Sequence, residues 1–159
     1  MANVSSDRRH LLFLCKPEFG HMIPLLSLAQ RLSVYHDITL AVSQIRLTEA
    51  RARGIIPSCS LDSKIAFYGV EDGLTEPSEH DVPFLQVVAQ SLQSGKMLSE
   101  LLGIIPTKQG PETERTPTMK PVDAIFCDIL MTVFVAPILK ARAVPLFMVE
   151  SAGAELMLL

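Results

Sequence analysis

The sequence has no surplus of positive charge and no long apolar run. Its 159 residues carry 14 Lys and Arg against 17 Asp and Glu, a formal net charge of -3. This balance provides no basic surface, so we expect binding neither to nucleic acid nor to an anionic membrane. No apolar stretch nears membrane-spanning length, and the run after Arg8 and Arg9 is too short for a signal peptide. The pattern therefore predicts a cytoplasmic protein.

Cysteine and phosphate-binding motifs are also scarce. Cys15, Cys59 and Cys127 are odd in number and far apart in the sequence, with no metal-ligand spacing, which predicts reduced structural thiols and no metal site. Gly20 is a lone glycine after an apolar run, without the GxGxxG of dinucleotide sites or the GxxxxGK[ST] of phosphate loops. Nicotinamide and ATP sites are therefore weakly supported, and we expect no cofactor.

What the sequence does contain is an alternation of strand and helix patterns. The hydrophobic share of 48% is enough for the core of one domain. Short β-branched or continuous apolar runs predict strands over 10–15, 38–42, 64–68, 122–127 and 145–149. Apolar periodicity and caps predict helices over 24–34, 43–53, 81–102, 131–142 and 154–159. This order predicts an α/β, Rossmann-like, three-layer domain with a parallel sheet.

Turn and capping residues set the expected boundaries of these elements. Pro24 is expected to open the first helix, because a first-turn residue needs no amide partner. Ser43 is expected to cap the second helix and Gly54 to end it. Residues 69–80 have the composition of a long loop, and residues 103–121 that of a mobile connection.

Polar residues follow three of the predicted strands. His21 comes after the first strand, Asp128 after the fourth and Glu150 after the fifth. The first and fourth strands are commonly neighbours in a doubly wound sheet, and a histidine held by a buried carboxylate is a general base for a hydroxyl. Simpler roles remain open: His21 at a helix start, Asp128 as an N-cap and Glu150 as a surface acid.

The run HLLFLCKPEFGHMIPLLSLAQRL resembles the opening of the family 1 UDP-dependent glycosyltransferases, especially the soluble plant-type enzymes. Their Pro-x-x-Gly-His loop corresponds here to residues 17–21. Two further segments resemble the family in order, KIAFYGVEDGLTE and PVDAIFCDILMTVFVAPILKARAVPLFMVESAGAELMLL. The resemblance spans nearly the whole chain and implies one half of a GT-B type fold.

The resemblance implies an inverting transfer of a sugar from a UDP-sugar to a hydroxyl of a small apolar or phenolic acceptor. By position, His21 matches the catalytic base and Asp128 the aspartate that holds it, and no metal is implied. The residues expected to line the acceptor site are Phe19, Gly20, Phe84, Glu150 and Ser151.

The chain departs from the family in one large respect. The family's donor-binding signature, rich in Trp, lies in a C-terminal domain, whereas this chain has no Trp and ends before that domain. We therefore expect residues 1–159 to be the N-terminal acceptor-binding domain, inactive without the C-terminal one, which would hold the UDP-sugar. The alternative is a non-catalytic small-molecule-binding or regulatory half-domain, and a flavodoxin-like domain is a weaker one.

Overall fold

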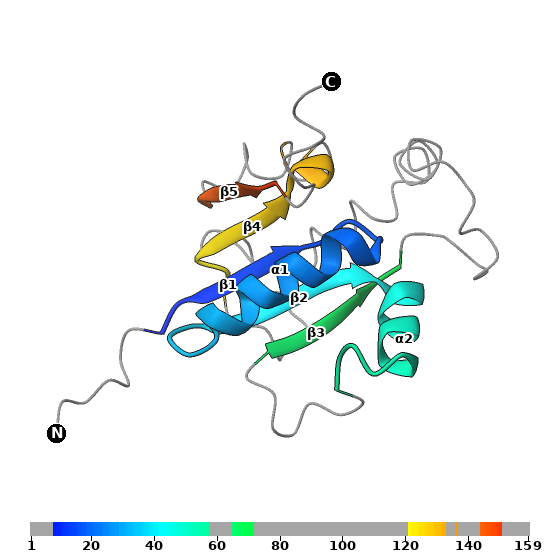
Figure 1. Ribbon diagram of the computed structural model, residues 1–159. Coiled ribbons are helices and arrows are strands. Elements are labelled where there is room, and N and C mark those ends of the chain that lie inside the picture. Colours follow the sequence, from blue (N-terminus) through cyan, green and yellow to red (C-terminus); the bar gives the residue numbers. More distant parts are fainter. Residues whose placement is uncertain (1–7, 58–64, 72–120, 133–135, 137–143, 151–159) are drawn as a thin grey trace, which may run out of the picture.

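The computed structural model describes residues 8–57, 65–71, 121–132, 136 and 144–150. Five parallel strands form one sheet in the order β3-β2-β1-β4-β5 (Figure 1). The strands are β1 (His10–Leu14), β2 (Asp37–Ser43), β3 (Ile65–Val70), β4 (Ala124–Asp128) and β5 (Leu146–Val149). The predicted α/β, Rossmann-like fold with a parallel sheet is confirmed.

Both faces of the sheet are buried at the central strands β1 and β2, as expected of a parallel sheet. Leu11 and Phe13 of β1 join the apolar cluster beneath α1 (Phe19–Leu32), which lies along the sheet in Figure 1. Leu12 and Leu14 alternate with them and belong to a second cluster on the opposite face. The continuous apolar run of β1 thus supplies both clusters, because successive side chains of a strand point to opposite faces.

The first helix begins earlier than the sequence predicted. α1 starts at Phe19, so the prediction that Pro24 opens the helix is wrong. The backbone N–H of His21 already donates to the carbonyl oxygen of Glu18 at 3.1 Å, which closes the first turn. Pro24 lies inside the helix and has no N–H, so the carbonyl oxygen of Gly20 lacks its helical donor. Both residues are exposed, so water can donate a hydrogen bond to this oxygen. His21 therefore lies in a helical turn rather than in a loop.

The second helix, α2 (Gln44–Ala52), matches the predicted span closely. Gly54 ends it with a φ of 69°, as expected of a left-handed residue after a helix, and Glu49 forms an ion pair with Arg53. Ser43 occupies the N-cap position, but its side chain makes no capping hydrogen bond, so the predicted cap is wrong. Its backbone belongs to the end of β2.

The ends of β3 and β4 also differ slightly from the predicted bounds. β3 continues through Gly69 to Val70, so the loop predicted to begin at Gly69 starts later. A Cβ at Gly69 would lie 1.7 Å from the side-chain oxygen of Gln44, so glycine allows this strand to approach α2 closely. β4 ends at Asp128, and a short 3₁₀ helix, η4 (Ile129–Met131), follows directly.

Several predictions lie outside the described residues. They are the helices over 81–102 and 154–159, the connection over 103–121, most of the helix over 131–142, and Cys59. Within the part that is described, no helix is both long and apolar enough to cross a membrane.

Candidate active site

The candidate site forms where β1 and β4 end side by side. Leu14 of β1 lies opposite Cys127 of β4, so Asp128 directly follows this pair at the carboxyl edge of the sheet. The chain leaves β1 and enters α1 within a few residues, which brings His21 to the same edge. The strand order confirms that the first and fourth strands are neighbours, and this is the place where open α/β sheets bind ligands.

His21 and Asp128 meet across 107 positions of sequence. The Nδ1 atom of His21 lies 2.7 Å from Oδ2 of Asp128, while the Asp128 side chain is 0% exposed and that of His21 14%. A carboxylate can only accept, so the Nδ1–H group of His21 is the donor. The other ring nitrogen, Nε2, then carries the lone pair that can take a proton, which is the arrangement of a histidine general base.

Asp128 also caps the element that follows it. Its Oδ1 atom accepts a hydrogen bond from the backbone N–H of Leu130 at 3.0 Å, and Asp128 is the N-cap of η4. The capping role and the contact with His21 therefore coexist, one on each carboxylate oxygen. Since the cap fixes the carboxylate plane, it also fixes the direction from which Asp128 holds the imidazole.

Two buried thiols lie next to this pair. Burial, followed by the negative charge of Asp128, raises the pKa of Cys127 from its ordinary value of 9.0 to about 12. Burial and the same carboxylate also raise the pKa of Cys15 far above its usual range. Neither cysteine is in a disulfide. Both thiols are therefore protonated at neutral pH and act as apolar packing around the aspartate.

A mostly apolar hollow opens at the same edge of the sheet. It is lined by Leu14, Cys15, Pro17, Ala41, Val42, Ser43, Val70 and Met131. Pro17 lies in the loop that leads to His21, and Met131 lies three residues after Asp128. Among the described residues, the Oγ atom of Ser43 has no hydrogen-bond partner although it is buried. The hollow thus offers a small apolar surface with one hydroxyl, and its lining does not include His21 or Asp128.

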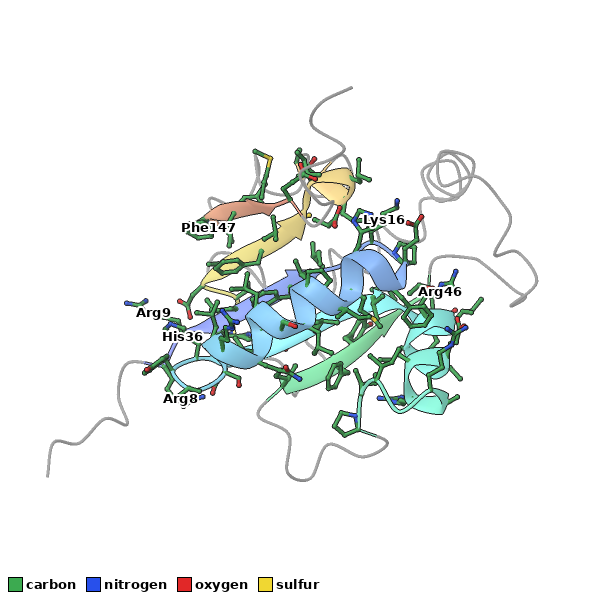
Figure 2. All side chains as sticks on the ribbon, in the orientation of Figure 1. Arg8, Arg9, Lys16, His36, Arg46 and Phe147 are labelled. Atoms are coloured by element: carbon green, nitrogen blue, oxygen red, sulfur yellow. The ribbon has the colours of Figure 1, made fainter. Side chains whose placement is uncertain are left out.

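An arginine of α2 holds the loop before His21. Nε of Arg46 donates to the carbonyl oxygen of Pro17 at 2.8 Å, and Nη1 lies 2.6 Å from Oε2 of Glu49. Figure 2 shows Arg46 and Lys16 at the end of the sheet where α1 begins. The ring of Phe19 lies under the guanidinium groups of Arg46 and Arg53, with centroid distances of 5.6 and 4.7 Å. Phe19 thus faces α2, and its role toward an acceptor remains a prediction.

The structure shows no contact that ties the other predicted lining residues to His21 or Asp128, as far as they are described. Gly20 is exposed in the first turn of α1, and a Cβ there would meet nothing within 4 Å. Glu150 is exposed and directly follows Val149, the β5 residue opposite Asp128. Phe84 and Ser151 lie outside the described residues. The structure therefore brings His21 and Asp128 together and leaves the acceptor contacts as predictions.

The sequence reasoning missed an ion pair beside the histidine. Nζ of Lys16 lies 2.9 Å from Oε1 of Glu18, and the Lys16 side chain is only 8% exposed. A lysine immediately after a buried strand is the signal that could have drawn attention to it, since a buried ammonium requires a partner. No group of three or more His, Cys, Asp or Glu residues could hold a metal ion, as far as the described ranges extend.

The sequence matches no protein-family profile and no curated protein. Solved structures do match it. A UDP-glucosyltransferase from Polygonum tinctorium that glucosylates indoxyl shares 20% identity, with a TM-score of 0.61 over 91% of this chain and 30% of that one. UGT89C1 of Arabidopsis thaliana, solved with UDP-L-rhamnose, shares 15%, with a TM-score of 0.61 over 94% and 35%.

A third match is TcCGT1, solved in complex with UDP, at 18% identity and a TM-score of 0.63. This match covers 95% of the present chain but 30% of TcCGT1, so the chain spans about a third of the length of these structures. Identities this low establish the fold alone. The chain has the α/β fold of one part of the plant UDP-glycosyltransferases.

Proposed function

We propose that this chain is the N-terminal, acceptor-binding part of a UDP-dependent glycosyltransferase. The observation that carries the proposal is the contact of 2.7 Å between His21 and the buried Asp128 at the carboxyl edge of the sheet. The similarity of fold to solved UDP-glycosyltransferases supports it. In this proposal, a further C-terminal domain that is not part of the 159 residues binds the UDP-sugar.

The proposed reaction is a single displacement at the anomeric carbon. His21 accepts the acceptor's hydroxyl proton at Nε2 while the hydroxyl oxygen forms a bond to that carbon. The bond between the carbon and the diphosphate oxygen breaks, and UDP leaves with the electron pair. One displacement inverts the configuration. Asp128 stabilises the imidazolium that forms, because its carboxylate already accepts the Nδ1–H hydrogen bond.

The acceptor proposed for this site is a small apolar or phenolic alcohol. The apolar hollow at the same edge of the sheet supports this choice, since its lining offers mainly aliphatic carbon and sulfur atoms. The hydroxyl of Ser43 could orient one polar group of such a molecule. Gly20, Phe19, Phe84, Glu150 and Ser151 complete the proposed acceptor site, and no metal ion is required.

The test compares two histidine substitutions in a protein that contains both this chain and its C-terminal domain. His21→Ala removes the proposed base, whereas His36→Ala removes a histidine at the opposite end of the sheet (Figure 2). We expect acceptor-dependent UDP release to fall by about 10²–10⁴-fold in the first variant and to stay within about twofold in the second. Acceptor binding should persist in both.

Unchanged UDP release by His21→Ala would overturn the assignment of the base. If the unsubstituted protein binds an acceptor but releases no UDP, the chain is a non-catalytic small-molecule-binding or regulatory domain instead. That second candidate is kept because the chain spans only about a third of the length of the structures it matches.

A further inference from the structure

A second carboxylate lies near the ring nitrogen that would accept the proton. Oε2 of Glu18 is 3.9 Å from Nε2 of His21, on the side of the ring opposite to the Asp128 contact. Hydrogen bonds between nitrogen and oxygen span about 2.7–3.2 Å, so this carboxylate is close to bonding but does not bond. A small rotation of the Glu18 side chain would close the gap.

Lys16 holds the other oxygen of that carboxylate. Its Nζ atom lies 2.9 Å from Oε1 of Glu18, within hydrogen-bond distance. The backbone N–H of Glu18 also donates to the carbonyl oxygen of Lys16 at 2.8 Å, so a tight turn sets the two residues relative to each other. The exposed fractions of the side chains are 8% for Lys16 and 47% for Glu18. The buried lysine is thus the fixed partner, and the glutamate is the one that can move.

The position of Glu18 in the chain keeps its carboxylate near the start of α1. It is the N-cap residue of this helix, but its side chain makes no capping hydrogen bond. The partial positive charge of the helix N-terminus attracts the carboxylate, so it will stay in this region whether or not Lys16 holds it. Without the ammonium, the charged partner that the structure still gives this carboxylate is the imidazole of His21, at 3.9 Å.

We propose that Lys16 is a positioning residue that keeps Glu18 from bonding to Nε2 of His21. If Glu18 closed this gap, Nε2 would carry a proton and donate a hydrogen bond to the Glu18 carboxylate. Asp128 would remain bound at Nδ1. A nitrogen in that state cannot accept the proton of an alcohol, and the carboxylate would occupy the place of the acceptor oxygen, about 2.6–3.2 Å from Nε2. The consequence for catalysis rests on the proposed function, but the geometry can be tested without turnover.

The test reads the proton on each ring nitrogen of His21 by ¹⁵N NMR of the chain, in buffer above the pH range in which an unperturbed histidine titrates. In the unsubstituted chain we expect Nδ1 to carry a proton and Nε2 to show the signal of an unprotonated nitrogen. Lys16→Met should replace that signal with one of a protonated Nε2. Lys16→Met combined with Glu18→Ala should restore the original spectrum, because no carboxylate remains to close on the ring.

Arg9→Met is the control. It removes a positive charge at the other end of the sheet (Figure 2), where Arg9 pairs with Asp123 and not with Glu18, so the Nε2 signal should stay unprotonated. If Lys16→Met does not fold, as judged by circular dichroism, Lys16→Gln removes the same charge with a polar end. An unprotonated Nε2 in the folded single variant, or a protonated one in the double variant, would overturn the proposal.

An activity measurement separates this inference from the proposed function. In a protein that contains the C-terminal domain, Lys16→Met should lower acceptor-dependent kcat by about tenfold or more, and the double variant should recover most of it. A purely structural lysine would not be rescued by the loss of a second residue. If neither the unsubstituted protein nor any variant releases UDP, the proposed function fails. The NMR result still decides the role of Lys16.

Discussion

At the scale of single residues, Asp128 is the centre of the account. Its two oxygens bind different partners, the Nδ1–H of His21 and the backbone N–H of Leu130, and its side chain is fully buried. Burying a carboxylate is costly unless donors surround it, so both bonds offset that cost. The same charge acts on the thiols beside it, which gives a pH dependence that can be measured.

We expect Cys127 to lower the stability of the chain in alkaline solution. In the unfolded chain its thiol ionises near pH 9.0, whereas in the folded chain burial and Asp128 raise the pKa to about 12. Between these values the folded state binds more protons than the unfolded state, so the free energy of unfolding falls as pH rises. The slope from this one thiol is about 1.4 kcal/mol per pH unit. It should fade as the pH falls through 9.0.

Urea unfolding at a series of pH values, with a reductant present, measures this slope. Other groups also titrate in this range, so the comparison is with Cys127→Ala, which keeps every group except the thiol. The fall in stability above pH 9.0 should be less steep in Cys127→Ala. Equal slopes in the two proteins would show that the thiol ionises as readily in the folded state as in the unfolded one.

At the scale of elements, α1 is fixed at both of its ends, which positions His21 in its first turn. At the start, the carbonyl oxygen of Glu18 accepts from the N–H of His21. At the far end, the guanidinium of Arg8 donates to the carbonyl oxygens of Ser33 and His36 at 3.0 and 2.7 Å (Figure 2). The first contact of Arg8 pairs the carbonyl of the C-cap residue, and the second holds the turn that follows the helix. The base is therefore held by a whole element rather than by a flexible loop.

Gly20 in the first turn of α1 and Gly54 after the end of α2 should respond oppositely to alanine. A Cβ at Gly20 or at Gly54 would meet no atom within 4 Å, but only Gly54 has a positive φ, of 69°. Gly54→Ala should lower the free energy of unfolding by about 1 kcal/mol, because the left-handed conformation is strained for alanine. Gly20→Ala should raise it by about 0.4–1 kcal/mol, because alanine favours the helix.

Chemical denaturation of the two variants beside the unsubstituted chain measures both differences, and the two sites serve as controls for each other. A similar loss at both positions would mean that side-chain space, not backbone conformation, decides the outcome. A gain at Gly54 would contradict the left-handed end of α2.

At the scale of the whole molecule, the sequence predicts the strands and their parallel arrangement better than the ends of the elements. The strands and their parallel arrangement follow from short apolar runs, and the place of Asp128 follows from the strand that it ends. The start of α1 was predicted wrongly, because Pro24 was expected in the first turn and lies inside the helix. The carbonyl that Pro24 leaves without a donor is exposed to water, and a local sequence rule does not include this exposure.

The side-chain pairs of the site divide in the same way. The contact of His21 with Asp128 could be predicted, because parallel strands place their carboxyl ends together. The ion pair of Lys16 with Glu18 could not, since it depends on how deeply the lysine is buried. Ser43 is both the last residue of β2 and the N-cap residue of α2, and its side chain makes no capping hydrogen bond. Tertiary packing, which no short motif records, decides both cases.

The measurement that tests the central claim most directly is the position of the proton on the His21 ring. The account predicts that ¹⁵N NMR of the unsubstituted chain, above the titration range of an ordinary histidine, finds the proton on Nδ1. Asp128→Asn is the matched variant: its amide oxygen can still accept from Leu130, while its amide N–H faces Nδ1 and should move the proton to Nε2. A proton on Nε2 in the unsubstituted chain would contradict the assignment of His21 as the base.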